Sequence, residues 1–167
     1  NREFILTSSP SMDILISSNL ERLIYIIAGC DASKNSELMS DLSKKGIYTV
    51  SDEMKNNLSD FIGEYADEKT VFDAIKKIYD ATGYVVDTHT AVAAAADMKV
   101  SCDTKKVIVS TASPYKFTRI VLKALNISEA FDDGIDDFAL VDKLSEISGV
   151  KIPNAVSEIR SAAILHD

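Results

Sequence analysis

The stretch VIVSTASPYKF, Val107 to Phe117, decides the fold class of this 167-residue chain. It opens with β-branched, uncharged residues, a pattern typical of a buried strand, and we expect a strand over 107–111. Small hydroxyl residues follow, and then proline, tyrosine and lysine. Ligands of α/β proteins bind beyond the carboxyl ends of strands, where the next helix begins. The groups from Thr111 to Lys116 are therefore expected at a ligand-binding edge.

Most of the remaining chain has the pattern of helices. Apolar residues recur at helical spacing, serine, aspartate or proline precedes the periodic segments, and glycine ends several of them. The predicted helices run from 19 to the stop at Gly29, 35 to 45, 51 to 61, 67 to 81, 90 to 99, from Pro114 onward, 136 to 148 and 154 to 165. Short strands or extended links are predicted at 3–7 and 46–50.

The predicted strand at 107–111 needs partners, because a lone strand cannot satisfy its own backbone hydrogen-bonding groups. This chain scarcely supplies them. The sequence also begins at Asn1 and not at a methionine, which favours a segment of a longer protein. We therefore predict an α/β, helix-rich fold with few strands of its own, part of whose sheet belongs to a segment outside this sequence.

The composition argues against several classes of partner. The formal net charge is −8, which disfavours nucleic acid or an anionic membrane as a main partner, since both need clustered cations. Cys30 and Cys102 lie far apart, and only two histidines are present, which indicates reduced thiols and no metal site. No apolar run approaches a membrane span and no signal-peptide pattern appears, so we expect a cytoplasmic protein.

Three hydroxyl-rich helix starts contain the candidate site residues. In the first, Thr111 and Ser113 can hold an anion through their hydroxyls and the free backbone N–H groups of the next helix, with Lys116 in its first turn. The alternative is simple capping, in which Ser113 satisfies the helix start and Lys116 is solvated.

The second helix start lies within 8–23. Five serines, Asn19 and Arg22 surround it, which suits a phosphate group. The alternative is a capping box of Ser18 and Glu21 after a turn-forming loop, with the arginine pointing outward.

The third helix start lies at 87–93, where Asp87, His89 and two threonines crowd together. His89 can orient a ligand or transfer a proton there, but such a histidine is more often a structural hydrogen-bonding group near a cap. The residues alone therefore indicate three helix starts that can converge on a phosphorylated ligand.

Longer motifs containing these helix starts occur in order along nearly the whole chain: SPSMDILISSNLERL at 9–23, GEYADE at 63–68, GYVVDTHTAVA at 83–93, STASPYKF at 110–117 and, more loosely, DDFALVDKL at 136–144. Together they resemble the C-terminal portion of the threonine synthases. The resemblance implies the tryptophan synthase β type of fold (fold type II), with pyridoxal phosphate bound between two α/β domains. It also implies conversion of O-phosphohomoserine and water to threonine and phosphate, by a carbon–oxygen lyase acting on phosphate.

The resemblance also implies site residues. Thr111 matches the hydroxyl residue that enzymes of this fold place against the pyridine nitrogen of the cofactor, and Ser110 and Ala112 flank it in the same segment. Other residues fall in motifs that face the substrate's phosphate or carboxylate in the family, and these are Lys116, Asn19, Arg22, His89 and Ser113.

One part of the family pattern is absent from this sequence. The Schiff-base lysine of the family lies in a Ser-x-Lys-Asp type motif, and the segments SKKG at 43–46 and SPYK at 113–116 lack the following aspartate. The loop for the cofactor phosphate does not appear either. We therefore predict that the chain does not turn over substrate alone, and that its partners are O-phosphohomoserine and the missing N-terminal part of the same protein.

The predicted organisation is a single fragment, 1–167, of a larger enzyme. Part of the cofactor-binding α/β unit is expected at 1–30 and 83–126, with helical segments at 31–82 and 127–167. Apolar surface that meets the missing part in the whole protein would be exposed in the isolated chain. We therefore expect the isolated chain to self-associate. Two other functions stay open: a pyridoxal-phosphate-dependent phospho-lyase that releases a keto acid from the same substrate, and a non-catalytic, stand-alone helical binding module.

Overall fold

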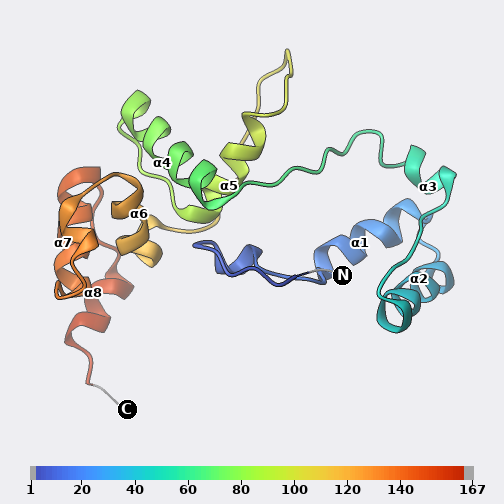
Figure 1. Ribbon diagram of the computed structural model, residues 1–167, viewed down its shortest axis with the longest axis horizontal. Coiled ribbons are helices and arrows are strands. Elements are labelled where there is room, and N and C mark those ends of the chain that lie inside the picture. Colours follow the sequence, from blue (N-terminus) through green and yellow to red (C-terminus); the bar gives the residue numbers. More distant parts are fainter. Residues whose placement is uncertain (1–2, 164–167) are drawn as a thin grey trace. The chain divides into compact units, whose positions relative to one another are not determined.

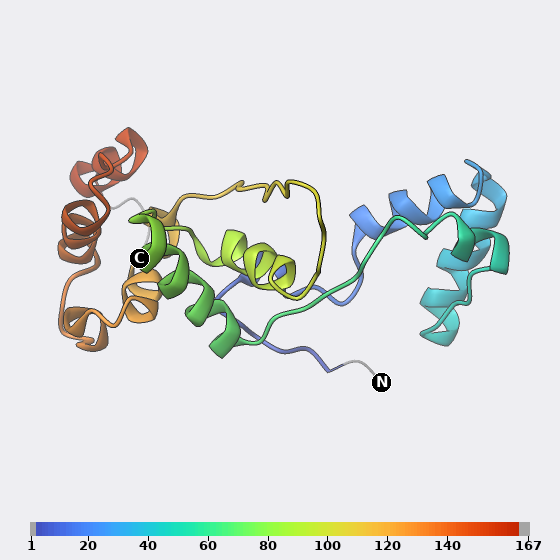
Figure 2. The ribbon, with the colours of Figure 1, turned by 90° about the horizontal axis from the view of Figure 1, so that it is seen from above.

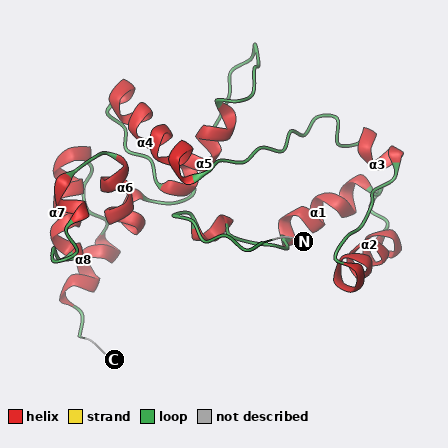
Figure 3. Cartoon of the chain, viewed as in Figure 1, coloured by secondary structure: helices red, strands yellow, loops and turns green. Residues whose placement is uncertain are grey.

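The structure is a computed structural model that describes residues 3–163, and within that range its regular elements are all helices (Figures 1 and 3). The α-helices are α1 (Ser18–Ile27), α2 (Ala32–Lys45), α3 (Asp52–Asn56), α4 (Glu68–Thr82), α5 (Thr88–Asp97), α6 (Thr118–Ala124), α7 (Asp137–Ser148) and α8 (Asn154–Ser161). Short 3-10 helices are η1 (Pro10–Met12), η2 (Pro114–Phe117) and η3 (Ser128–Phe131).

The helix pattern predicted from the sequence is confirmed, and so are several of its end signals. Ser51 and Asp67 accept hydrogen bonds from the backbone N–H groups at the starts of α3 and α4. Gly83 ends α4 with a φ of 73°, a left-handed conformation that favours glycine. Ser113 caps η2, in which Pro114 occupies the first turn.

Several helix boundaries differ from prediction. Helix α2 begins at Ala32 and not at 35, and α8 ends at Ser161 and not at 165. The cap of α1 is Ser17 and not Ser18, because the Ser17 hydroxyl accepts the Leu20 N–H at 3.3 Å. The expected capping box with Glu21 is therefore wrong. The helix after Ser51 ends at Asn56 and does not reach 61. Helix α5 begins at Thr88, two residues before the predicted start at 90, because Asp87 caps it.

The strand predicted at 107–111 is not formed within the described chain (Figure 3). At 3–7 and 46–50, where a short strand or an extended link was predicted, no strand is formed and the link is the alternative that remains. Residues 107–111 make no backbone–backbone hydrogen bond with any other described residue. Val107 and Val109 are 87% and 73% exposed. Figure 2 shows the chain after α5 as a loop that runs back to α6. The physical reason is the lack of a neighbouring strand among residues 3–163, so this apolar, β-branched stretch stays unpaired.

The chain forms two compact units. Unit 1 consists of Asn1–Leu6 and Asp13–Gly63, and unit 2 of Thr7–Met12 and Glu64–Asp167. In unit 1, α1 packs against α2, and the buried core residues are Ile24, Ile27, Leu38 and Met54. In unit 2, α4 packs along α5 while α6 contacts both α4 and α7, and fully buried residues include Ile75, Leu122, Leu140 and Leu144.

The predicted grouping of 1–30 with 83–126 as one cofactor-binding unit is not tested by this packing and stays a prediction. No helix within 3–163 is long and apolar enough to cross a membrane. Within the same range, no cluster of three or more acidic, histidine or cysteine side chains is arranged to hold a metal ion. Cys30 and Cys102 are both free and exposed.

Candidate functional site

Three sequence-distant stretches of unit 2 meet at His89. The backbone N–H of Ser11, in η1, donates to His89 Nε2 at 3.1 Å, across 78 sequence positions. On another side, the ring of Phe117, from η2, lies 4.8 Å from the imidazole, centroid to centroid, with a tilt of 43°. His89 itself is only 7% exposed. The structure thus brings together parts of the motifs at 9–23, 83–93 and 110–117.

A buried carboxylate organises the start of α5. Asp87, 1% exposed, accepts hydrogen bonds from the backbone N–H groups of His89 at 2.8 Å and of Thr90 at 3.3 Å. It also accepts from the Thr90 hydroxyl. That hydroxyl lies 2.9 Å from the Ser110 hydroxyl. A continuous chain of hydrogen bonds therefore runs from Asp87 through Thr90 to the segment predicted to meet the cofactor.

The hydroxyl groups of the segment 110–113 differ from one another in their hydrogen-bond partners. Thr111 is exposed, and its hydroxyl has no hydrogen-bond partner among the described residues. Ser110 is also exposed but bonded to Thr90. Ala112 is half-buried. Ser113 Oγ accepts the N–H of Tyr115 at 3.3 Å, so the capping alternative is confirmed for this residue. Thr111 is thus the hydroxyl that can contact a ligand.

Lys116 lies just beyond that segment, in η2. Its side chain is exposed and forms no ion pair with a described carboxylate, while its Nζ lies 5.9 Å from the ring centroid of Phe117. An exposed cation without an acidic partner among the described residues can contact an anionic group of a ligand.

Asn19 and Arg22 belong to unit 1, in the first two turns of α1. Both are exposed, and neither side chain hydrogen-bonds to another described residue. Their neighbour Glu21 instead accepts from the side chain of Asn35 at 3.3 Å. The side chains of Asn19 and Arg22 are therefore available to a ligand. Ser11, His89 and Phe117, in contrast, belong to unit 2.

The link through Asp87 and Thr90 to Ser110 was missed by sequence reasoning. Part of the signal was present: an aspartate followed by threonine three positions later is a helix-start pattern, which places a side-chain carboxylate near N–H and O–H donors. The contact to Ser110 was not predictable, since it joins residues 20 positions apart through the tertiary packing of an unpaired segment.

Searched against models of protein families, the chain matches none. It is 35% identical over 130 residues to human "Threonine synthase-like 1", a match covering 77% of this chain and 18% of that protein. It is likewise 35% identical over 136 residues to the threonine synthase of Schizosaccharomyces pombe, covering 72% of this chain and 26% of that protein. Its fold superposes on the structure of PLP-bound threonine synthase from Brucella melitensis with a TM-score of 0.65 and 30% identity, over 90% of this chain and 31% of that one.

The chain belongs to the threonine synthase family. The resemblance stated from the motifs is thereby confirmed. The prediction that the fold is a helix-rich part of such a protein is confirmed as well. The chain spans less than a third of the length of the relatives it matches. The match covers only a part of the threonine synthase fold, so the activity of the whole protein is a matter for proposal.

Proposed function

We propose that this chain forms part of a pyridoxal-phosphate-dependent threonine synthase, in which it supplies the hydroxyl that faces the cofactor ring and several groups that bind the substrate. The reaction is conversion of O-phosphohomoserine and water to threonine and phosphate. The observation that carries the proposal is the match to a PLP-bound threonine synthase over 90% of this chain. The exposed hydroxyl of Thr111 supports it, since it has no hydrogen-bond partner within residues 3–163 and lies in the cofactor motif.

The residues around Thr111 fit a pyridine ring. The ring nitrogen needs one hydrogen-bonding group that is not already used by the protein. A hydroxyl suits this need because it can donate or accept a hydrogen bond. Thr111 offers that group, whereas Ser110 is held by Thr90 and Ala112 adds no bulk. When bound, pyridoxal phosphate supplies an electron sink for charge that develops on the substrate. A neutral hydroxyl at the ring nitrogen, in place of a carboxylate, tempers the electron demand of the ring.

The substrate groups are assigned by charge and availability. Lys116 and Arg22 are exposed cations suited to the phosphate or carboxylate of the substrate, and Asn19 provides amide donors. Ser113 contributes through the helix start that it caps. His89 was predicted among the substrate-facing residues as well, and its contacts favour an indirect role that is developed below.

The chain alone is proposed to be inactive, because the lysine motif and the cofactor-phosphate loop of the family do not occur in its sequence. The test is to incubate the purified 167-residue chain with pyridoxal phosphate and O-phosphohomoserine and to measure phosphate. Release above the protein-free control would contradict this part of the proposal.

The function itself is tested in a chimera. The region of the Schizosaccharomyces pombe enzyme that matches this chain over 136 residues is replaced by the corresponding part of this chain. We expect the chimera to restore growth of a threonine auxotroph without added threonine. A folded chimera that fails to do so while the parent enzyme succeeds would count against the proposal, and would favour the non-catalytic binding module.

The phospho-lyase alternative stays open because it starts from the same substrate and uses the same cofactor. Both reactions release phosphate, so product analysis separates them. Threonine from the chimera supports the proposed function, and a keto acid supports the alternative.

The remaining part of the same protein is the proposed partner, and the cytoplasm is the proposed location. The exposed side chains of Val107, Val109, Phe61 and Ile62 also support the predicted self-association of the isolated chain, since apolar surface of this kind tends to become covered. Size-exclusion chromatography that gives a monomer at high concentration would contradict that prediction.

A further inference from the structure

The imidazole of His89 is engaged by protein groups on both of its nitrogens. We propose that His89 is a positioning residue: in the neutral form with its proton on Nδ1, it fastens the η1 stretch to the start of α5 and so holds the cofactor-facing segment in place. It does this through Ser11 and Asp87, without contacting the substrate.

The hydrogen bond from Ser11 assigns the tautomer. A backbone N–H can only donate, so Nε2 of His89 must carry a lone pair and no proton. The single ring proton of a neutral imidazole then lies on Nδ1. Nδ1 lies 3.4 Å from the Thr88 hydroxyl, which can accept that proton in a hydrogen bond, and 3.4 Å from Oδ1 of Asp87, whose negative charge favours a proton on this nitrogen.

Packing fixes the ring in this orientation. Phe117 lies against one side of it, and the whole residue is 7% exposed. A ring flip would place the Cε1–H group where Nε2 now accepts, and would leave the Ser11 N–H without an acceptor in a partly buried place, which is unfavourable. His89 therefore acts as a fixed link between η1, α5 and η2.

The link extends to the cofactor segment through Asp87. The same carboxylate that faces the imidazole accepts the His89 backbone N–H and the hydroxyl of Thr90, whose oxygen meets Ser110. Ser110 precedes Thr111 in the chain. Displacing His89 is expected to disturb this chain of hydrogen bonds and, with it, the position of the Thr111 hydroxyl. The consequence for turnover rests on the proposed function, whereas the tautomer and the hydrogen bond to Ser11 do not.

The first test is NMR spectroscopy of the full 167-residue chain labelled with ¹⁵N. The chain has one other histidine, His166, which lies outside the described residues, and a His166→Gln variant assigns the signals. We expect His89 to show an unprotonated Nε2 and a protonated Nδ1. A protonated Nε2 at neutral pH would overturn the proposal.

The second test compares two variants by hydrogen exchange at the Ser11 amide. His89→Phe keeps a ring beside Phe117 but removes the acceptor, and we expect exchange at Ser11 to become about tenfold faster. His89→Gln can offer a side-chain oxygen in place of Nε2 and is expected to restore much of the protection. Unchanged exchange in His89→Phe would overturn the proposal, and if that variant does not fold, the tautomer in the unsubstituted chain decides.

The third test measures phosphate release by the chimera described above. We expect His89→Phe to lower kcat about tenfold with little change in KM, and His89→Gln to recover most of it. A rise in KM alone would show that His89 binds substrate directly and would contradict a positioning role. A chimera that is inactive with histidine, phenylalanine and glutamine alike at position 89 would refute the proposed function. The tautomer and the exchange rate at Ser11 would still test the positioning role independently.

Discussion

The hydroxyl oxygens of Thr90 and Ser110 lie 2.9 Å apart. This contact joins the first turn of α5 to a segment that makes no backbone–backbone hydrogen bonds at 107–111 within the described chain. The extended segment is therefore held on unit 2 at its carboxyl end, where the candidate site residues begin. On the α5 side this anchor is buried, because the Thr90 hydroxyl donates to the buried Asp87 carboxylate behind it.

Removing the Asp87 carboxylate should weaken unit 2. Asp87→Ala leaves the N–H groups of His89 and Thr90 without their acceptor in a buried place, so the free energy of unfolding should fall by about 2 kcal/mol. Asp87→Asn keeps one acceptor oxygen and should lose less. Urea denaturation followed by circular dichroism measures both values, and equal losses for the two variants would contradict this account of the cap.

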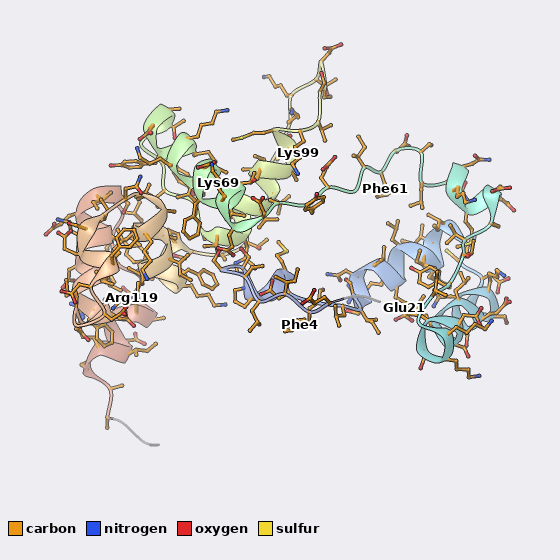
Figure 4. The ribbon with its side chains drawn as sticks, viewed as in Figure 1. Phe4, Glu21, Phe61, Lys69, Lys99 and Arg119 are labelled. Carbon is orange, nitrogen blue, oxygen red and sulfur yellow. The ribbon has the colours of Figure 1, made fainter. Side chains whose placement is uncertain are left out.

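Arg119 in α6 should be difficult to replace by lysine (Figure 4). Its guanidinium donates to the Asp137 carboxylate and to the backbone oxygens of Asp132 and Ile135, and so fixes the connection between η3 and α7. Lysine cannot reproduce that forked geometry. We expect Arg119→Lys to lower the free energy of unfolding by about 1 to 2 kcal/mol.

The matched control is Arg160→Lys. Arg160 donates to one backbone oxygen and one exposed carboxylate, and its loss should cost less than about 0.5 kcal/mol. A control variant as destabilised as Arg119→Lys would show that the network around Arg119 has no special role.

Cys102 should be the more reactive of the two exposed thiols. Hydrogen bonds from the hydroxyl and the backbone N–H of Thr104 lower its pKa, and the Sγ to Oγ1 distance is 2.9 Å. Because the thiolate is the nucleophile, iodoacetamide at neutral pH should label Cys102 before Cys30. Mass spectrometry of tryptic peptides gives both rates. Thr104→Val should slow labelling of Cys102 and leave Cys30 unchanged, whereas an equal rate at both thiols in the unsubstituted chain would refute the prediction.

Glu129 should stay ionised at a lower pH than an ordinary glutamate, because its pKa is lowered. Hydrogen bonds from the Ser128 hydroxyl and from its own backbone N–H, together with Lys143 at 3.1 Å, lower its pKa from the ordinary 4.5 to about 2. A carboxyl group whose pKa is lowered on folding stabilises the fold above its ordinary pKa. That stabilisation should therefore be present above pH 4.5 and be lost as the pH falls from there to about 2.

An NMR titration of the Glu129 carboxyl carbon measures the midpoint directly. Lys143→Ala should move it upward, because a cation is removed. A midpoint near the ordinary value in the unsubstituted chain would contradict the geometry of this ion pair.

The sequence predicted helices well because their signals are local. Ser51, Asp67 and Ser113 cap the elements that they were expected to cap, since a cap depends on residues two or three positions away. The strand at 107–111 failed for the opposite reason: β-branched residues predict an extended backbone, but pairing requires a neighbour that no described part of this chain provides. The helix start at 87–93 was recognised as polar, but the role of Ser11 as donor to His89 depends on a contact across 78 positions.

The central claim is that the Thr111 hydroxyl faces the ring of pyridoxal phosphate in a threonine synthase, and the most direct measurement is the kcat of the chimera with Thr111→Ser and Thr111→Val. Serine keeps the hydroxyl, and valine has the shape of threonine without it. The account predicts that the serine variant stays within a few-fold of the unsubstituted chimera while the valine variant falls by about ten- to a hundredfold. A valine variant as active as the unsubstituted chimera would contradict the claim.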